Sequence, residues 1–559
     1  MSLDVAVVGN GAAALMAALH ARRADVRLRV GMLFGSPTGQ SGCSINAQGL
    51  NAAIGVDDSP ALHFEDVVRA GRFVADQALA WTVAAGAPDE LELIAAGAAL
   101  NRDPDGEPTR TAYEGQSRRR RLQSAQGIGL QLVRHLGALV EREGVIQLPG
   151  IVGVELLADD NAEIGGILAI EPATGATVTV SARAIVLATG GGAASLYPLA
   201  TAPATKTCDG LAMAYRAGLE LRDLEFVQFL PMGMRPRDGG PPGAAIREGV
   251  RFAGAHLLNA RGERYMARYH NDQERGPRDV VARATYAEIA VAGDPDGAVW
   301  LDVAPIGQEI LEARFRDVIA HAASAGFDIV RERIPVAPTA HVGIGGVVVD
   351  IDGRTSREGV LAAGEDAGGT HGASWQPGNG LAEAVVLGAR TGRAAAAMAA
   401  DRRPCSVGSG RATPPPIAVP ADRPEAGTTD AEVLLRDLRG VMFDRVGLVR
   451  SEEGLAAAAA SIEALAERAA TAEVGVLPAP GAPSASAIGI RNQLAVASLV
   501  VAAARARTES RGVHSRSDYP DEDPRWLSTI VLRAPVSASG WIGEPDVVVR
   551  AAELTRLQP

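Results

Sequence analysis

The first chemistry that the residue order allows is the binding of nucleotide phosphates. Gly9 and Gly11 follow a β-branched apolar run and precede an alanine- and leucine-rich stretch, in LDVAVVGNGAAALMAALHARR (3–23). Gly9 permits a tight turn, Gly11 lets the backbone approach a pyrophosphate, and Ala14 allows close packing of a helix on a strand. The phosphates would lie at the helix N-terminus, where free N–H groups favour negative charge. The pattern predicts a dinucleotide site, with an ordinary tight turn as the alternative.

The usual ribose-binding carboxylate is missing from this pattern. A second strand is expected over residues 26–34, and an acidic residue normally stands at its end to bind the ribose hydroxyls. Phe34 and Gly35 occupy that place here. We therefore expect Ser36 or backbone groups to bind the ribose.

Two later segments repeat the change from strand to glycine. ARAIVLATGGG (182–192) and REGVLAAGEDAGG (357–369) each read as a buried strand that ends in glycines, and Glu365 stands at the end of the second. Three such transitions suit one long ligand that crosses the carboxyl ends of a parallel sheet.

In their order, these pieces resemble the flavoprotein family of fumarate reductase, succinate dehydrogenase and L-aspartate oxidase. The resemblance runs through nearly the whole chain. The matching stretches are GNGAAA (9–14), SINAQGLNAA (44–53), VLATGGGAASLYPLATAPATKTCDGLAMAYRAG (186–218), LEFVQF (224–229), ERGPRDVVARA (274–284), PTAHVGIGGVVVDIDGRTS (338–356), AAGEDAGGTHGAS (362–374) and RTESRGVHSRSDYPDED (507–523).

The resemblance implies FAD as the cofactor, bound without a covalent link. Cys43 stands where the succinate dehydrogenase branch has its flavin-linking histidine; we expect a packing residue there, and a cysteinyl flavin is the alternative. The positions expected to line the cofactor are Gly9, Gly11, Ala12, Ala13, Ala14, Ser36, Cys43, Ser44, Ala47, Gln48, Gly49, Thr189, Gly190, Gly191, Asp209, Gly364, Glu365, His371, Asn379 and Leu381.

The resemblance also implies an α/β architecture. A Rossmann-like FAD-binding domain would take residues 1–230 and 345–402, with an α+β capping domain inserted at 231–344. A proline-rich linker (403–424) would lead to a C-terminal helical domain (425–559). Apolar periodicity predicts helices there over 432–446, 453–471 and 488–509.

In this family a flavin takes or gives a hydride while a protein group moves the accompanying proton. The arginine of a Pro-Arg-Asp motif moves that proton, and Arg278 holds the matching place. Its pKa must be tuned by a dry, charged pocket, since a free arginine titrates above about 12. A structural salt bridge to Asp279 or a nearby glutamate is the alternative. His341 matches the histidine that hydrogen-bonds a substrate carboxylate.

IREGVR (246–251) matches the family stretch Thr-Glu-x-x-Arg. Glu248 and Arg251 occupy its charged positions, and Arg247 replaces the threonine. In a helix Arg247 and Arg251 would share one face. We therefore expect them to form an anion clamp beside the catalytic Glu248.

Two family substrate residues are replaced. Leu230 stands for a histidine, and Trp375 stands for the arginine that grips the second carboxylate. Neither residue can make a charge-assisted bond to a carboxylate, whereas tryptophan offers a flat apolar wall. We expect a substrate that is larger or more planar than succinate, fumarate or aspartate, with one carboxylate.

The run of four arginines at 118–121 is typical of a solvated surface, and the resemblance implies that this stretch also lies near the flavin; we assign it no catalytic role. The net charge of −12 disfavours nucleic acid and acidic membranes as partners, and favours a small molecule. Three distant cysteines exclude a disulfide framework and an iron–sulfur cluster. Electrons would therefore leave to O2 or an external acceptor.

The chain is expected to be soluble and cytoplasmic, and a homo-oligomer is compatible with it. The first strand begins at Leu3, which leaves no room for a secretory leader, and the longest apolar run (494–504) is short of a membrane span. We predict an FAD-dependent oxidoreductase acting on a C–C or C–N bond. The alternatives are L-aspartate oxidase, the flavoprotein subunit of a fumarate reductase or succinate dehydrogenase complex, and a flavin-binding scaffold without turnover.

Overall fold

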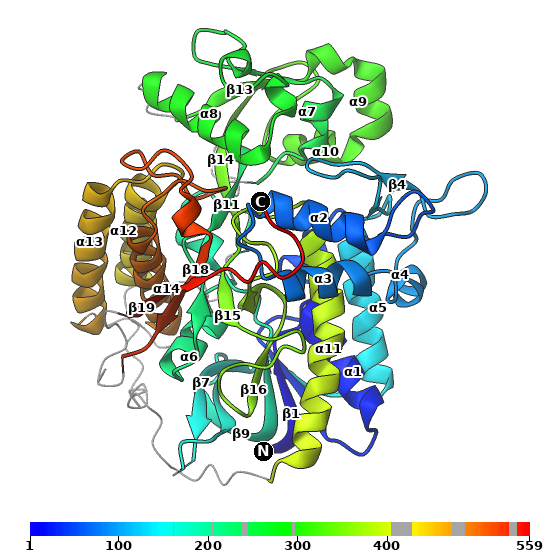
Figure 1. Ribbon diagram of the computed structural model, residues 1–559, viewed down its shortest axis with the longest axis vertical. Coiled ribbons are helices and arrows are strands. Elements are labelled where there is room, and N and C mark those ends of the chain that lie inside the picture. The colour runs from blue at the N-terminus through cyan, green and yellow to red at the C-terminus, as the bar shows by residue number, and fades with distance from the viewer. Residues whose placement is uncertain are drawn as a thin grey trace.

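A mixed sheet that carries helices on its face forms the base of the protein (Figure 1). The strand order is β6-β2-β1-β9-β8-β7, and β16 pairs with β9. Pairing is parallel from β6 to β9 and antiparallel from β9 to β7. The strands are β1 (Ser2–Val8), β2 (Val30–Phe34), β6 (Ile146–Pro149), β7 (Val152–Ala158), β8 (Ile164–Glu171), β9 (Ala176–Leu187) and β16 (Val360–Ala362). This sheet confirms the expected α/β class.

The computed structural model describes residues 1–159, 161–203, 205–235, 244–292, 297–403, 428–471, 487–535 and 545–559. Nearly all of the predicted proline-rich linker therefore lies outside the described residues.

Helices rich in alanine and leucine cover the base sheet. α1 packs between α11 and α5, and both α1 and α11 contact the strands. Small residues let α1 and α11 approach closely; a Cβ at Gly388 would lie 2.7 Å from the Ala13 carbonyl oxygen. The helices of the base are α1 (Ala12–Ala24), α2 (Pro60–Ala70), α3 (Gln77–Gly86), α4 (Leu91–Gly97), α5 (Ile128–Arg142), α6 (Asp209–Arg216) and α11 (Asn379–Asp401).

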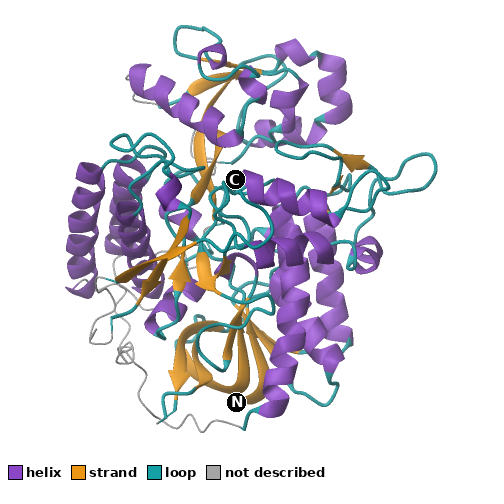
Figure 2. Cartoon of the chain, in the orientation of Figure 1, coloured by secondary structure: helices purple, strands orange, loops and turns teal. Residues whose placement is uncertain are grey.

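A small sheet, β3-β5-β4, forms an arm that extends from the base (Figure 2). Its strands are β3 (Leu50–Asn51), β4 (Arg110–Thr111) and β5 (Arg121–Leu122). The loop between β4 and β5 carries residues 112–120 toward the lid described next.

The lid is a separate antiparallel sheet with its own apolar core, centred on Met232, Leu257 and Val281. The strand order is β11-β14-β13-β12. Its strands are β11 (Val227–Met234), β12 (His256–Leu258), β13 (Val299–Asp302) and β14 (Ile334–Gly343), and its helices are α7 (Gly249–Ala253), α8 (Arg278–Ala292), α9 (Gln308–Arg314) and α10 (Arg316–Ser324). Figure 1 shows this lid in green above the base.

A fourth sheet joins the C-terminal end of the chain to its middle. Its order is β17-β15-β10-β18-β19. The strands are β10 (Leu221–Arg222), β15 (Gly346–Val348), β17 (Ala367–Gly368), β18 (Ser528–Arg533) and β19 (Asp546–Ala551). The C-terminal region is therefore not only helical, because its last strands complete a sheet that begins with β10.

The three predicted C-terminal helices are present. They are α12 (Thr428–Val446), α13 (Glu452–Thr471) and α14 (Ala487–Ala506), and they pack against one another. α14 ends before residue 509, because the segment that follows is a tight turn.

α14 is longer than the apolar run seen in the sequence. Within the described ranges it is the one helix long and apolar enough to cross a membrane, but 72% of its apolar window is buried inside the protein. A helix buried in the core of a protein has the same length and apolar composition.

Candidate functional site

The N-terminus of α1 is open for a phosphate. Gly9 has φ +123°, and a Cβ there would clash with the Ala188 carbonyl at the end of β9. The N-cap residue, Gly11, has no side chain to cap the helix, and the Ala12 amide donates to Ser44 Oγ at 3.1 Å. The first turn has no acidic residue. The residues present therefore fit a pyrophosphate, which the helix dipole and amides would attract.

The second glycine cluster is pinned by an acid that the sequence patterns did not single out. Asp366 accepts hydrogen bonds from the Gly191 amide (2.8 Å) and the Thr189 hydroxyl (3.0 Å). Gly190 and Gly191 both have positive φ. The Thr189 side chain is thus used to hold the protein together, while the glycine backbone lines the expected cofactor position.

Lys206 is a buried cation among the expected FAD residues. Its ammonium forms an ion pair with Glu365 at 3.2 Å and donates to the Gly190 carbonyl. Burial opposes its charge, but the acids Glu365 and Asp366 raise the pKa of Lys206. No local pattern marks this lysine, because its acidic partner lies 159 residues away.

Cys43 is set in a place that keeps its thiol protonated. Burial raises the pKa of Cys43, although Lys206 acts in the opposite direction. Attack on a flavin needs a thiolate. The arrangement favours the packing role over the cysteinyl flavin.

Three further positions expected to line the cofactor, Ser36, Ala47 and Gln48, differ in their hydrogen bonds and exposure. The Ser36 carbonyl accepts from Asn10 Nδ2 at 2.6 Å, just beyond β2. The Ala47 carbonyl accepts from the Gly129 amide of α5 at 3.1 Å, and Gln48 is exposed.

Asp209 is engaged within the protein and not left free for a cofactor. Thr207 and Asn492 of α14 each donate to the same oxygen of its carboxylate at 2.7 Å. The Asp209 side chain thus ties α6 to the C-terminal helices, and its expected contact with the cofactor stays a prediction.

His371 and Asn379 lie near the N-terminus of α11. His371 Nε2 lies 3.0 Å from Glu383 Oε2, while its Nδ1 is buried without a hydrogen-bond partner. Asn379 Oδ1 lies 2.7 Å from Asn51 Nδ2 and 2.8 Å from His63 Nε2. An orphaned ring nitrogen beside an open helix N-terminus fits a polar cofactor ring. Gly364 and Leu381 are buried in the same region.

Arg278 lies at the start of α8, where the lid meets the base. It is 5% exposed, and its guanidinium forms an ion pair with Glu248, not with Asp279. Burial opposes the charge, but Glu248 and Glu114 raise the pKa of Arg278. Its Nε and Nη1 are buried without hydrogen-bond partners. A group delivered to this face would meet free donors.

Glu248 lies between two arginines. Arg251 Nη2 lies 2.6 Å from one carboxylate oxygen, and Arg278 contacts the other. Burial acts against ionisation, but the two guanidinium groups lower the pKa of Glu248 to about 2. Arg278, Glu248 and Arg251 thus form a continuous buried chain of donors and acceptors.

Glu114 is a site residue that the sequence patterns did not reveal. It comes from the arm of the base; its Oε1 accepts from the Arg278 amide, and its Oε2 lies 3.6 Å from Arg251. Burial first, and the neighbouring Glu248 second, raise the pKa of Glu114 to about 7. It therefore caps α8 and adds a second acid to the arginine pair.

The Trp375 ring lies beside the row of charged side chains formed by Arg278, Glu248 and Arg251. Its ring lies 5.4 Å from the Arg278 guanidinium carbon, 5.2 Å from the His341 ring and 6.5 Å from the His371 ring. Gln228 Oε1 holds the Trp375 amide at 3.0 Å. Leu230 is buried in β11. The structure thus brings Trp375, His341 and Arg278 together.

His341 is neutral in this setting. Burial and the positive charge of Arg278 lower its pKa to about 3. Its Nδ1 lies 2.7 Å from the Thr201 hydroxyl. The ring is therefore oriented as a hydrogen-bonding group and not as a cation.

The expected clamp of Arg247 and Arg251 does not form. The helix begins at Gly249, so Arg247 precedes it. Arg247 lies 3.3 Å from Asp317 and donates to the Arg314 carbonyl at 2.8 Å, whereas Arg251 turns inward to Glu248. The two side chains diverge because no helical turn aligns them.

The arginine run is only half solvated. Arg118 and Arg119 are exposed, but Arg120 is 0% and Arg121 is 7% exposed. β5 pairs with β3 and β4 at this point and draws the last arginine of the run inward. The expectation of a wholly solvated face was wrong.

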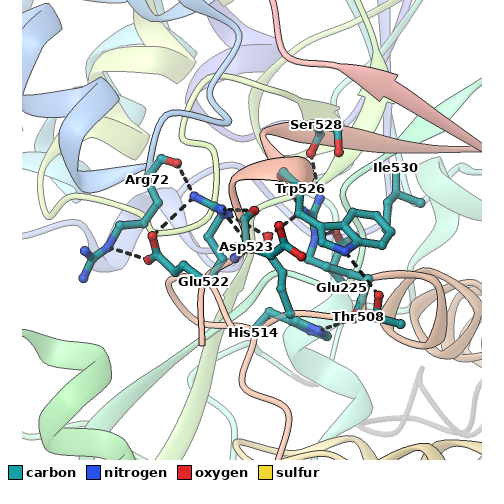
Figure 3. Close-up of polar contacts among 12 residues, drawn as sticks. Arg72, Glu225, Thr508, His514, Glu522, Asp523, Trp526, Ser528 and Ile530 are labelled. Atoms are coloured by element: carbon teal, nitrogen blue, oxygen red, sulfur yellow. Dashed lines mark hydrogen bonds and ion pairs between the residues drawn. The ribbon is translucent and has the colours of Figure 1, made fainter. Parts of the chain in front are cut away.

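A turn at residues 507–523, whose Arg507, Glu509 and Arg511 side chains are buried, lies against the site. Arg507 bonds to Glu225 (2.7 Å) and to Glu509 (3.1 Å), and Arg511 bonds to Glu509 at 2.7 Å. Figure 3 shows how this network reaches Arg72, whose carbonyl accepts from Arg511 at 3.1 Å.

The same turn touches both halves of the site. The Val513 amide donates to the Ala373 carbonyl at 2.9 Å, two residues before Trp375. Arg283 of α8 donates to the Gly512 carbonyl at 3.0 Å. One segment thus contacts the loop that carries Trp375 and the helix that begins with Arg278.

Among the described residues, no group of three or more His, Cys, Asp or Glu side chains is arranged to hold a metal ion.

Two family descriptions match the chain. Residues 4–381 match the FAD binding domain, and residues 435–556 match the C-terminal domain of the fumarate reductase flavoprotein.

Relatives span almost the full length. The chain is 34% identical over 544 residues to one component of the CoM/CoB fumarate reductase of Methanothermobacter marburgensis, covering 95% of this chain and 96% of the relative. It is 36% identical over 532 residues to L-aspartate oxidase of Caulobacter vibrioides, covering 94% and 95%.

Solved structures agree with this. Quinol fumarate reductase FrdA of E. coli, in a mutated form, has a TM-score of 0.88 at 27% identity, covering 100% of this chain and 98% of that one. Sdh1 of Mycobacterium smegmatis has a TM-score of 0.85 at 31% identity, covering 100% and 95%.

Proposed function

Because the chain belongs to the fumarate reductase and L-aspartate oxidase family of FAD-dependent oxidoreductases, we propose that it oxidises or reduces a C–C or C–N bond of a carboxylated small molecule, with Arg278 transferring the proton. The observation that carries the proposal is the buried chain from Arg278 through Glu248 to Arg251, facing Trp375 and His341. FAD supplies or accepts the hydride when it is bound.

The chain of charges explains how an arginine can move a proton. Arg278 rests protonated, since the acids around it raise its pKa, and it can therefore donate a proton to a substrate carbon during reduction. Glu248, with a pKa of about 2, is ionised. During oxidation it can take the proton of Arg278, which leaves Arg278 able to accept one from the substrate; during reduction it can pass to Arg278 a proton that it first receives from Arg251. Arg251 continues the path, so no mobile water has to enter the pocket.

His341 would position the substrate. It is neutral, and Thr201 fixes its Nδ1 side, so the opposite ring nitrogen can hydrogen-bond a carboxylate. A fixed hydrogen bond holds the reacting carbon near the guanidinium and contributes through orientation rather than through charge.

The substrate would not be a simple four-carbon dicarboxylate. Leu230 and Trp375 cannot hold a second carboxylate through the two charged hydrogen bonds that an arginine makes, whereas the Trp375 ring presents an apolar surface beside Arg278. A larger or flatter acid would gain from that surface. A cytoplasmic setting, with O2 or an external carrier as electron acceptor, completes the proposal.

L-aspartate oxidase is the second candidate, because Glu114 favours it. Its carboxylate stands beside Arg278 and Arg251 and could pair with a substrate amine. Reduction of the flavin by L-aspartate, with peroxide formed at the turnover rate of an efficient enzyme, would establish this candidate and remove our substrate proposal.

The test is the substitution Arg278→Gln in the FAD-loaded protein. General acid–base groups contribute about 10²- to 10⁴-fold, so the rate of flavin reduction or reoxidation by a turned-over carboxylate should fall by that factor. The flavin absorbance spectrum and the FAD content should stay unchanged. Stopped-flow absorbance measures the rate.

Arg261→Gln is the matched control, because Arg261 is an exposed lid arginine (66%) paired only with Glu263 within the described lid. It should turn over like the unaltered protein. Full activity in Arg278→Gln would contradict the proposal.

A further inference from the structure

Two adjacent buried arginines have opposite surroundings. Arg120 is fully buried and pairs with two acids, Asp58 at 2.9 Å and Asp66. Arg121 is 7% exposed. Over the ranges of the chain that the structure describes, no acid forms an ion pair with Arg121, and its Nε has no hydrogen-bond partner. The same arm thus holds one neutralised and one unneutralised guanidinium.

The surroundings of Arg121 do not compensate its charge. The Tyr113 ring lies 4.3 Å from its guanidinium carbon, which is a weak cation–π contact compared with a carboxylate. Burial is the main cause that lowers the pKa of Arg121; Tyr113 opposes this in part, and the positive charges of Arg278 and Arg247 add to the lowering. A buried charge without a partner is unfavourable, so an anion from outside would stabilise it.

Arg121 lies where such an anion would meet the flavin and the lid. Its side chain crosses Gly49, in the stretch expected to bind FAD, and a Cβ at Gly49 would clash with Arg121 Nε. Tyr113, stacked on Arg121, lies 5.6 Å from Phe252 of α7, next to Arg251. The absence of a side chain at Gly49 is what allows Arg121 this position.

We propose that Arg121 binds an anionic group of the substrate, a carboxylate. This rests on the proposed function and defines its substrate class: the acid is gripped from the arm of the base and not from the Trp375 loop. The planar guanidinium can hold a carboxylate through two hydrogen bonds. Arg121 thus supplies the charge that Trp375 and Leu230 do not.

The experiment titrates the FAD-loaded protein with malonate and follows the flavin absorbance. Malonamide, which has the same shape without charge, is the matched probe. The unaltered protein should respond to malonate and not to malonamide. Arg121→Met should weaken malonate binding at least tenfold without changing the FAD content, and Arg121→Lys, which keeps the charge but loses the planar fork, should fall between.

Arg119→Met is the control variant, because Arg119 belongs to the same run and is exposed; it should bind malonate normally. Unchanged malonate binding in Arg121→Met, loss of FAD from that variant, or no malonate response in the unaltered protein would each overturn the proposal. If Arg121→Met does not fold, Arg121→Lys decides by the same measurement.

The two proposals fail separately. Arg278→Gln should lose turnover and should weaken malonate binding less than Arg121→Met does. Full turnover in Arg278→Gln, with a malonate defect in Arg121→Met, would remove the proton-transfer proposal and leave the anion site.

Discussion

The acids of the site differ in the charge that they carry near neutral pH. Glu248 lies between Arg278 and Arg251 and has a pKa of about 2, while burial and Glu248 itself raise the pKa of Glu114 to about 7. Glu248 therefore stays ionised throughout the physiological range. Glu114 gains or loses its charge within that range.

The pH dependence should follow Glu114. Below about pH 7 it is protonated and neutral, so the arginines attract a carboxylate more strongly; above that pH its negative charge repels the substrate. We expect KM for a carboxylated substrate to rise as pH increases through 7, and this rise to be lost in Glu114→Gln. Initial rates measured from pH 5.5 to 8.5 check it.

Glu107→Gln is the control, since Glu107 is an exposed acid that shortly precedes β4 of the same arm. It should keep the unaltered pH profile. A profile in Glu114→Gln that still bends at 7 would assign the titration to another group.

The sequence predicted the residues that sit in contiguous motifs. Arg278, Glu248, His341 and Trp375 were each selected from a local pattern, and the structure brings them together. Glu114 and Lys206 were missed because their partners are distant in the chain. Arg121 was assigned no role because it belongs to a run of arginines that is usually solvated. No local spacing reveals that Glu114 meets an amide 164 residues away.

Among the elements, the turn at 507–523 has the widest reach. It contacts Ala373 of the Trp375 loop and Arg283 of α8, and its own arginines are neutralised by Glu225 and Glu509. Because both halves of the site rest on one rigid turn, a change there should alter catalysis without touching the pocket.

Gly512→Ala should show this. Gly512 has φ +56°, and a Cβ would clash with the Ala373 carbonyl. We expect the free energy of unfolding to fall by about 1–3 kcal/mol and kcat/KM to fall with it, as the Trp375 loop shifts. Urea unfolding and initial rates measure the two effects.

Gly440→Ala is the matched glycine. It lies inside α12, and a Cβ there would meet nothing within 4 Å. This change should raise the free energy of unfolding by about 0.5–1 kcal/mol and leave kcat/KM alone. Equal losses of activity in both variants would mean that Gly512 has no special role.

Helices were predicted well where the periodic apolar pattern extended over many residues. The 20-residue helix α13 was predicted to within a residue or two, whereas β18 and β19 were missed. β19 is six residues long and largely exposed, and its pairing with β18 gives it order that its own sequence does not. Arg247 was misplaced because a five-residue helix has too few turns to predict its start.

On the scale of the whole molecule, the expected FAD path joins segments that are far apart in the chain. Ala12 and Ser44 meet at the start of α1, and Glu365 and Lys206 lie beside Gly190. A ligand that contacts all of them binds only the folded chain, so it should stabilise the protein as a unit.

Removal of FAD should therefore lower thermal stability. With FAD at 1,000 times its Kd, ligand binding contributes about 4 kcal/mol to the free energy of unfolding. We expect the apo protein to melt earlier and the shift to grow with added FAD. Calorimetry at several FAD concentrations checks it. A melting temperature independent of FAD would contradict an FAD site formed by segments that are distant in the chain.

The pairing of β10 with β18 has a consequence for biosynthesis. Asp223 bonds to Thr529, which lies 306 residues further along. At roughly 5–20 residues per second, a ribosome needs about 15–60 s between these two points. During that interval the edge of β10 has no partner, so the nascent chain must be shielded from aggregation, and shortening the C-terminus past β18 would make that exposure permanent.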